Sequence, residues 1–332
     1  MIALLDTSDD STISWQLASV LVAVGVVGLV FGGHLLVSGA VSVAKRLGMS
    51  TLMIGLTIVA LGTSAPELAL NVIAAAGGET CLAFGNVIGS NIANIALVLG
   101  LTALVAPIPI PRATLKLGGI PWLILLTLIA VALPWMGDSP ENSPSYQRWS
   151  GILLLCCVPL TILLWQRDQR IKDENEDVDE IPSRDLLPSV LLVLGGLVLL
   201  IAGGRSTEMG AVSLARWMGL SEAVIGLSIV AVATSLPEIV TSVVAARKGV
   251  PSLAIGTVIG SNIFNLSLVL GTTSIVSPVI LPESGGMIDL FIMAGLTLCL
   301  LPLAITGRRI ARPEGVLLLV VWAAAITFSI MR

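Results

Sequence analysis

The fold of this chain is decided by a short polar stretch within an apolar run, Gly62-Thr63-Ser64-Ala65-Pro66-Glu67. The stretch occurs again 171 positions later, as Ala233-Thr234-Ser235-Leu236-Pro237-Glu238. A charged side chain near the centre of a bilayer costs roughly 2.5–3.5 kcal/mol on insertion scales. Something must therefore regularly neutralise Glu67 and Glu238, which makes these two carboxylates the first candidates for function.

The composition indicates an integral membrane protein. Of the 332 residues, 55% are apolar and 11% are charged, and the mean hydropathy is +1.00. A water-soluble domain carries about 25% charged residues, so this chain has too little polar surface for a globule in water. We expect an all-α polytopic protein of the cell (inner) membrane, in contact with the lipid bilayer, with no nucleic-acid partner and no obligate protein partner.

Apolar runs long enough to cross a hydrocarbon core of about 30 Å predict ten transmembrane helices. They lie at 15–43, 51–76, 81–105, 118–136, 150–165, 186–215, 222–246, 252–277, 287–306 and 314–331. The polar segment 166–185 carries an acidic cluster and predicts a solvated cytoplasmic linker. It divides the chain into a first five-span half, 1–165, and a second five-span half, 186–332.

The basic residues predict the orientation. Thirteen of the 17 Lys and Arg residues fall in alternate loops, which the positive-inside rule assigns to the cytoplasm, so both termini are expected outside. The segment 1–14 has no Lys or Arg and lacks the basic region of a cleaved signal peptide. Because the first half has five spans, the second half starts from the opposite face, and the two similar halves form an inverted repeat.

The repeat preserves its polar positions over a long stretch without insertion or deletion, from Gly33 to Gly100. Within it, Gly85-Asn86-Val87-Ile88-Gly89-Ser90-Asn91-Ile92-Ala93-Asn94 recurs as Gly256-Thr257-Val258-Ile259-Gly260-Ser261-Asn262-Ile263-Phe264-Asn265. Two unrelated apolar helices would not share polar residues in this way. Inverted repeats of this kind place a substrate site near the midplane, between interrupted helices.

The polar side chains of the repeat supply hard oxygen ligands. On a helix, Thr63 and Ser64 share a face with Glu67, and Pro66 frees a backbone carbonyl one turn earlier. The doubled set is Thr63, Ser64, Glu67, Ser90 and Asn94 with Thr234, Ser235, Glu238, Ser261 and Asn265. Carboxylate, hydroxyl and amide oxygens suit Ca²⁺ or Na⁺. The four cysteines show no metal-ligand spacing and are interpreted as small hydrophobic residues.

The charge of the site favours a countertransport mechanism. Two buried carboxylates that face each other repel, so the empty site is unfavourable unless it is protonated or hydrated. One Ca²⁺, two Na⁺ or two protons would each cancel the two charges. Mutually exclusive occupancy of this kind is what an antiporter needs.

The paired G/A-T-S-x-P-E stretches, each followed by G-S-N-I-x-N, resemble the α-repeats of the cation/calcium exchanger superfamily, in particular the prokaryotic sodium/calcium exchangers. This resemblance implies ten transmembrane helices and alternating access by sliding of the first and sixth helices against the other eight. It implies that the two glutamates bind Ca²⁺ and that the flanking hydroxyls complete Na⁺ sites, with added backbone oxygens near Ala60 and Ala231. Some members carry Asp at the position of Asn265, so the Na⁺ stoichiometry and any K⁺ dependence stay open.

We therefore expect a Na⁺/Ca²⁺ antiporter with no enzymatic activity and no cofactor, only transported Ca²⁺ and Na⁺. A proton-coupled Ca²⁺ exchanger or a potassium-dependent exchanger of the same fold is the alternative. A hydrolase is disfavoured because no His or Lys base lies in the motif spans, and a channel because inverted repeats favour alternating access.

Several other residues have simpler interpretations. Small residues in membrane helices usually serve close packing, so Gly32-Gly33 and Gly203-Gly204 are expected at helix contacts. Arg205 and Glu208, three residues apart, are expected to pair with each other. His34, the only histidine, is expected to face a crevice.

Overall fold

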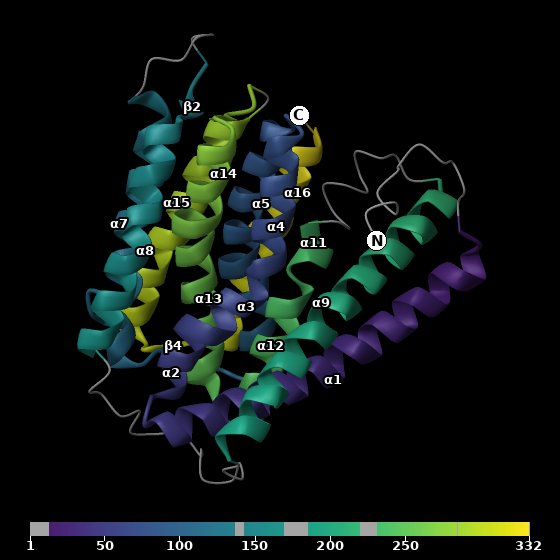
Figure 1. Cartoon of the computed structure of the whole chain (residues 1–332), viewed down its shortest axis with the longest axis vertical. Helices are drawn as coiled ribbons and strands as arrows, with labels where there is room; N and C mark the ends of the chain where they lie inside the picture. Colours follow the sequence, from purple (N-terminus) through teal and green to yellow (C-terminus); the bar gives the residue numbers. More distant parts are fainter. Residues whose placement is uncertain (1–12, 137–142, 169–184, 220–230, 284, 332) are drawn as a thin grey trace.

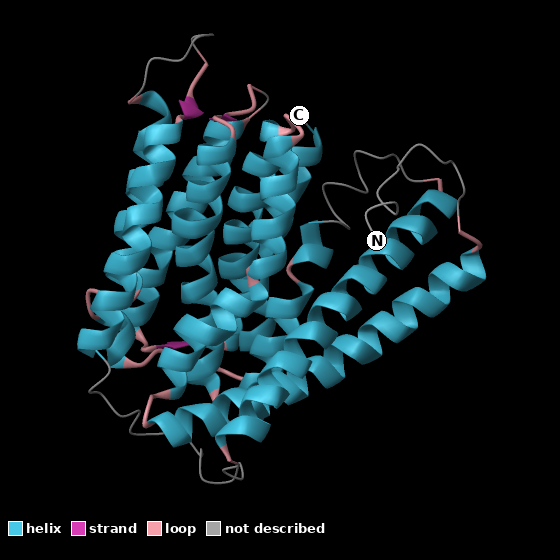
Figure 2. Ribbon diagram, viewed as in Figure 1, coloured by secondary structure: helices cyan, strands magenta, loops and turns pink. Residues whose placement is uncertain are grey.

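The protein is a bundle of helices in which eight segments are long and apolar enough to cross a membrane, within the part of the chain that the structure describes. A computed structural model describes residues 13–136, 143–168, 185–219, 231–283 and 285–331 (Figure 2). The polytopic helical class is thereby confirmed. The seventh expected span, 222–246, lies partly outside the described residues, so the count of ten stays a prediction.

The described helices of the first half follow the expected spans closely, and several of them are interrupted. They are α1 (Trp15–Leu47), α2 (Thr51–Ile54), the π-helix η1 (Gly55–Val59), α3 (Ala60–Thr63), α4 (Ala65–Ala76), α5 (Thr80–Ala93), the π-helix η2 (Asn94–Val98), α6 (Leu99–Val105), the 3₁₀-helix η3 (Arg112–Leu115), α7 (Ile120–Ala132), the 3₁₀-helix η4 (Leu133–Trp135) and α8 (Arg148–Asp168).

The second half repeats this order within its described residues. Its helices are α9 (Leu186–Trp217), α11 (Ala231–Thr234), α12 (Leu236–Arg247), α13 (Pro251–Phe264), the π-helix η7 (Asn265–Val269), α14 (Leu270–Val276), α15 (Gly286–Thr306) and α16 (Arg312–Met331). Glycines with positive φ recur at the repeat distance. Gly48 (φ 65°) follows α1, and Gly219 (φ 76°) follows α9. Such a backbone favours glycine, which has no Cβ.

Four two-residue strands join the halves. Strand β1 (Ile108–Pro109) pairs antiparallel with β4 (Arg309–Ile310), and β2 (Ser145–Tyr146) pairs antiparallel with β3 (Val279–Ile280). The strands β1 and β3 are equivalent in the repeat, and each pairs with a strand of the other half. The labelled strands β2 and β4 lie at opposite ends of the bundle in Figure 1.

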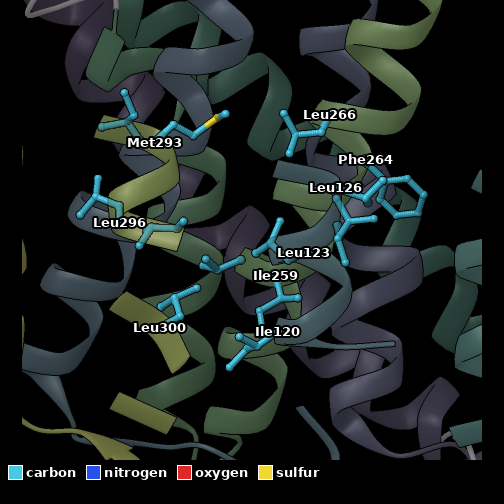
Figure 3. Close-up of a cluster of buried hydrophobic side chains, with 14 of the residues drawn as sticks. Ile120, Leu123, Leu126, Ile259, Phe264, Leu266, Met293, Leu296 and Leu300 are labelled. Atoms are coloured by element: carbon cyan, nitrogen blue, oxygen red, sulfur yellow. The ribbon is translucent and has the colours of Figure 1, made fainter. Parts of the chain in front are cut away.

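The main hydrophobic core lies among α7, α13 and α15. Figure 3 shows Leu123 and Leu126 of α7 against Ile259 and Phe264 of α13, with side chains of α15 on the other side. Because α13 is buried on nearly every side, it forms the centre of the bundle. The helices around it present apolar faces to the surroundings, as expected in lipid.

The helices α1 and α9 form a long antiparallel pair beside the bundle, and Figure 1 shows them crossing it at a slant. Glycines lie where they touch. A Cβ added to Gly32 would lie 2.8 Å from the Leu200 nitrogen, and one added to Gly203 would lie 2.7 Å from the Gly25 carbonyl oxygen. Gly32 and Gly203 are therefore contact residues, as expected, and they let the two backbones approach closely.

Candidate cation site

The two signature stretches lie at breaks between helices. The first break is at Ser64 (φ −84°, ψ −2°), between α3 and α4, and the second is at Ser235 (φ −90°, ψ 1°), between α11 and α12. Proline follows two residues later, within the first turn of α4 and of α12, where its missing N–H does no harm. The expected interruption is confirmed, but Thr63, Ser64 and Glu67 do not lie on one continuous helix.

A second irregularity faces each break. The helices α5 and α13 change to π-helical turns that begin at Asn94 and Asn265 and end at Val98 and Val269. In both turns the amide of the following leucine donates to the asparagine carbonyl, five residues earlier. Single π-helical turns inside α-helices are frequent at functional sites.

The sequence-predicted side chains are almost all buried. Glu67 is 6% exposed and Glu238 is 1% exposed, and Thr234 is the one predicted ligand side chain that is half-buried rather than buried among those described. The others are Thr63, Ser64, Ser90, Asn94, Ser235, Ser261 and Asn265. Ala60 is also fully buried. A buried polar group normally has a partner, so this concentration requires an explanation.

Thr63 joins the two halves of the chain at this site. Its Oγ1 lies 3.4 Å from Oγ of Ser261 on α13 and donates to the carbonyl oxygen of Ala60 at 3.3 Å. The Glu238 carboxyl group on α12 lies near the same hydroxyl. Oxygens from both halves therefore lie close together here, those of Ala60 and Thr63 from the first half and those of Ser261 and Glu238 from the second.

The two glutamates act on each other electrostatically. Each is the first acidic residue after its helix break, and the two carboxyl groups lie near enough for their charges to interact. One carboxylate oxygen of each, Oε2, is buried without a hydrogen-bond partner. Two such carboxylates require a counter-charge, because an uncompensated buried charge is strongly destabilising.

The backbone at each break keeps a main-chain hydrogen bond. The Ser64 N–H donates to the carbonyl of Ala60 at 3.0 Å, and the Ser235 N–H donates to the carbonyl of Val232 at 3.1 Å. The serine at each break is therefore tied to the turn before it.

Further buried polar atoms extend the site beyond the predicted residues. Among the described residues, those with an unpartnered side-chain oxygen include Asn71, Thr241 and Ser242, which follow the glutamates by three or four positions, and Asn91 and Asn262. The signal was present in the sequence, since a spacing of three or four places a residue on the glutamate face of a helix. Asn91 and Asn262 lie inside the repeated motif itself.

The anionic charge of the site comes from the two glutamates alone. In the described part of the chain, no group of three or more His, Cys, Asp or Glu residues is arranged to hold a metal ion. All four cysteines are free. The arrangement therefore suits a cation that accepts many neutral oxygens and two carboxylates, which is the ligand preference of Ca²⁺ and, with fewer charges, of Na⁺.

Comparison with known proteins shows one family. The sequence profile described as "Sodium/calcium exchanger protein" matches residues 17–164 and 188–331. The protein CaxA of Alkalimonas amylolytica is 39% identical over 312 residues, covering 91% of this chain and 95% of the relative. The sodium/calcium exchanger MaX1 of Methanosarcina acetivorans is 31% identical over 335 residues, covering 90% and 95%.

The fold is also similar to solved structures. The sodium-calcium exchanger NCX_Mj, soaked with 10 mM Na⁺ and zero Ca²⁺, superposes with a TM-score of 0.81 at 27% sequence identity. The similarity covers 95% of this chain and 99% of that one. The helical architecture described above is thus shared over essentially the whole length.

Proposed function

Because this chain belongs to the sodium/calcium exchanger family, we propose that it is a secondary active antiporter that exchanges Na⁺ for Ca²⁺ by alternating access. It is an integral multi-pass membrane protein. One observation carries the proposal: the Thr63 hydroxyl lies 3.4 Å from the Ser261 hydroxyl, which belongs to the other half of the chain, and the Glu238 carboxyl group of that half lies near it. A cation held at this point has ligands from both halves, so its binding depends on how the halves are arranged.

The proposed ligands are oxygens at the two breaks, in α5 and α13, and at the start of the π-helical turns that follow those two helices. Glu67 and Glu238 bind Ca²⁺, and the surrounding hydroxyl, amide and carbonyl oxygens complete Na⁺ sites. These are Thr63, Ser64, Ser90, Asn94, Thr234, Ser235, Ser261 and Asn265, with the backbone oxygens of Ala60 and Ala231. The burial of the described side chains supports this assignment, as do the unpartnered oxygens of Ser64, Ser235 and Asn265.

The proposed topology has ten transmembrane helices in two inverted five-helix repeats, 1–165 and 186–332, joined by a cytoplasmic linker, 166–185. Two features support the inversion. The strands equivalent in the repeat pair crosswise at opposite ends of the bundle, and both helix breaks and both π-helical turns recur at the repeat distance. The positions of Lys and Arg support placing both termini outside the cytoplasm.

The coupling follows from charge. One Ca²⁺ cancels both carboxylates, and Na⁺ ions do the same, so the two ions compete for one set of oxygens. A site that is neutralised can cross between the two access states, whereas a bare pair of buried carboxylates resists the movement. Exchange by this mechanism makes and breaks no covalent bond and needs no cofactor.

The direct test is a flux measurement on the purified protein in proteoliposomes loaded with Na⁺. An outward Na⁺ gradient should drive uptake of external Ca²⁺, and replacing internal Na⁺ with choline at fixed pH should stop it. Uptake that persists in choline and follows an imposed pH gradient would instead establish H⁺/Ca²⁺ exchange. Uptake that requires K⁺ as well as Na⁺ would establish potassium dependence.

A further inference from the structure

The α1–α9 pair packs against one of the two half-helices that follow the breaks, namely α12. A Cβ added to Gly33 of α1 would lie 2.8 Å from Cγ1 of Val240 and 3.5 Å from Cγ2 of Val244. Just beyond the end of α12, Nζ of Lys248 donates to Oγ of Ser38 at 2.6 Å and to the main-chain oxygen of His34 at 3.2 Å. The end of α12 therefore packs against α1 through apolar contacts and through hydrogen bonds from the Lys248 ammonium group.

The equivalent face of α4 is uncovered. Val244 is 7% exposed, but its repeat equivalent Ile73 is 61% exposed; Leu70, the equivalent of the fully buried Thr241, is 38% exposed. The α9 residue equivalent to Gly33 is Gly204, and the nearest atom to a Cβ added there is Cγ of Pro237, on α12, at 3.6 Å. Both α1 and α9 thus pack against α12, and Figure 1 shows that their upper parts are separated from α4.

The basic residue also changes its place between the two halves of the repeat. The position equivalent to Lys248 is Gly77, which has no side chain, and the position equivalent to His34 is Arg205. In the contact between α1 and α12, the cation is Lys248, which follows α12. In the equivalent contact between α9 and α4, the cation would be Arg205 of α9. Arg205 is 54% exposed and pairs with Glu208 at 2.7 Å in this structure.

The end of α4 suits a cation. The helix ends at Ala76, and the C-terminal end of a helix carries partial negative charge even though the carbonyls of Ile73, Ala74 and Ala75 accept main-chain bonds from Gly77, Glu79 and Gly78. Glu79 follows within three residues, and its side chain is exposed. An arginine favours both kinds of acceptor, since its guanidinium group donates to carboxylates and to carbonyl oxygens.

We propose that Lys248 and Arg205 each stabilise one of the two states of the transport cycle, and we call these two residues the latches. Lys248 holds α12 to α1 in the state seen here, and in the opposite state α9 packs on the bare face of α4 while Arg205 leaves Glu208 and binds Glu79 and the end of α4. The proposal rests on alternating access as proposed above. An exposed ion pair such as Arg205–Glu208 contributes little to stability, so Arg205 can leave Glu208 at little cost.

A charge-reversal series in the full-length protein tests the second latch. Arg205→Glu and Glu79→Arg should each slow Ca²⁺ uptake into proteoliposomes by about fivefold, and the double variant should recover most of the rate. The matched control combines Arg205→Glu with Glu208→Arg, which restores only the pair seen in this structure, and should not recover the rate. Rescue by Glu208→Arg and none by Glu79→Arg would overturn the proposal.

A cross-linking experiment tests the same point without any transport measurement. In a variant whose four cysteines are replaced by alanine, one cysteine pair is placed at 38 and 248 and another at 79 and 205. A short bifunctional thiol reagent should link either pair but never both in one molecule. In a variant that carries only the 79–205 pair, Lys248→Met should increase the yield of that link. A molecule carrying both links, or a 79–205 link that never forms, would overturn the latches.

The two experiments separate this inference from the proposed function. If the links exclude each other but no Na⁺ gradient drives Ca²⁺ uptake, the coupling ion is wrong and the latches stand. If Na⁺-driven uptake is present and Glu79 shows no coupling to Arg205 in either experiment, the latches are wrong and the exchange stands.

Discussion

The hydroxyl of Thr63 lies 3.4 Å from the hydroxyl of Ser261, so the first half of the chain meets the second inside the buried polar cluster. The Glu238 carboxyl group of α12 lies near the same threonine. A cation bound there would hold together residues of α3, α12 and α13. Any movement of one half against the other would therefore change its ligands, which is the requirement for coupling ion binding to a change of access.

The first prediction concerns this contact. Thr63→Val and Ser261→Ala should each raise the Ca²⁺ concentration for half-maximal uptake by about tenfold, because each removes one oxygen ligand of the proposed cation. In the double variant, the rise in this Ca²⁺ concentration should be smaller than the product of the two single rises, since the residues act on one site. Thr63→Ser keeps the hydroxyl and is the matched control. Independent, multiplicative effects would show that the two hydroxyls do not share a cation.

The second prediction concerns the α1–α9 interface. Gly203→Ala should lower the free energy of unfolding by about 1–3 kcal/mol, because the new Cβ would lie 2.7 Å from the Gly25 carbonyl and 2.8 Å from the Leu29 nitrogen. Thermal unfolding in detergent measures the change. Gly195 lies on the same helix with no atom within 4 Å of its added Cβ, so Gly195→Ala should be neutral or slightly stabilising. Equal effects of the two substitutions would contradict close packing at Gly203.

The third prediction concerns Tyr146, the only tyrosine, which is fully buried and donates from its hydroxyl to the Ala130 carbonyl at 2.8 Å. Tyr146→Phe should lower the free energy of unfolding by about 1 kcal/mol near neutral pH, because a buried carbonyl loses its donor. The measurement is thermal unfolding in detergent, with the unmutated protein as reference.

The same residue makes the free energy of unfolding depend on pH. Burial raises the pKa of Tyr146, so above about pH 10 the unfolded chain ionises its tyrosine while the folded chain keeps the proton. The unmutated protein should then lose stability with rising pH more steeply than the phenylalanine variant. Parallel pH profiles for the two proteins would show that the hydroxyl is not buried.

The fourth prediction concerns net charge movement. If three Na⁺ leave for each Ca²⁺ that enters, one positive charge leaves the vesicle per cycle, and a potential of 100 mV changes the driving force by about 2.3 kcal/mol. Making the vesicle interior positive should therefore accelerate Ca²⁺ uptake driven by internal Na⁺. Uptake rates that do not change with a clamped potential would indicate an electroneutral exchange of two Na⁺ for one Ca²⁺.

Much of the site could be predicted because its causes are local in the sequence. Pro66 and Pro237 fix where the helices break, and the repeat of the polar residues identifies which side chains belong together. The pairing of Arg205 with Glu208 follows from a spacing of three on a helix and is confirmed. The membrane class follows from composition alone and is confirmed by the eight apolar helices in the described residues.

Other features depend on contacts between distant segments and have no local signal. Strand β1 is two residues long and contains Pro109, so no alternating pattern marks its pairing with β4. The π-helical turns at Asn94 and Asn265 arise within otherwise ordinary helical sequence. The bond from Lys248 to Ser38 spans 210 positions and could not be inferred from either neighbourhood.

His34 illustrates the difference between a residue and its backbone. Its side chain is exposed, and the expectation that it faces a crevice stays a prediction. The contact that the structure assigns to this position is made by its main-chain oxygen, which accepts from Lys248. Sequence patterns describe side chains, so a backbone acceptor of this kind leaves no signal in them.

The most informative measurement is Na⁺-driven Ca²⁺ uptake by the Glu67→Gln and Glu238→Gln variants in proteoliposomes, with Glu283→Gln, at an exposed position, as the control. Each buried substitution removes one of the two charges that a Ca²⁺ ion neutralises while keeping the shape of the side chain. Both variants should fold and reconstitute normally and lose nearly all uptake, and the control should transport at the unmutated rate. Substantial Na⁺-driven uptake in either buried variant would show that the paired carboxylates do not hold the transported ion.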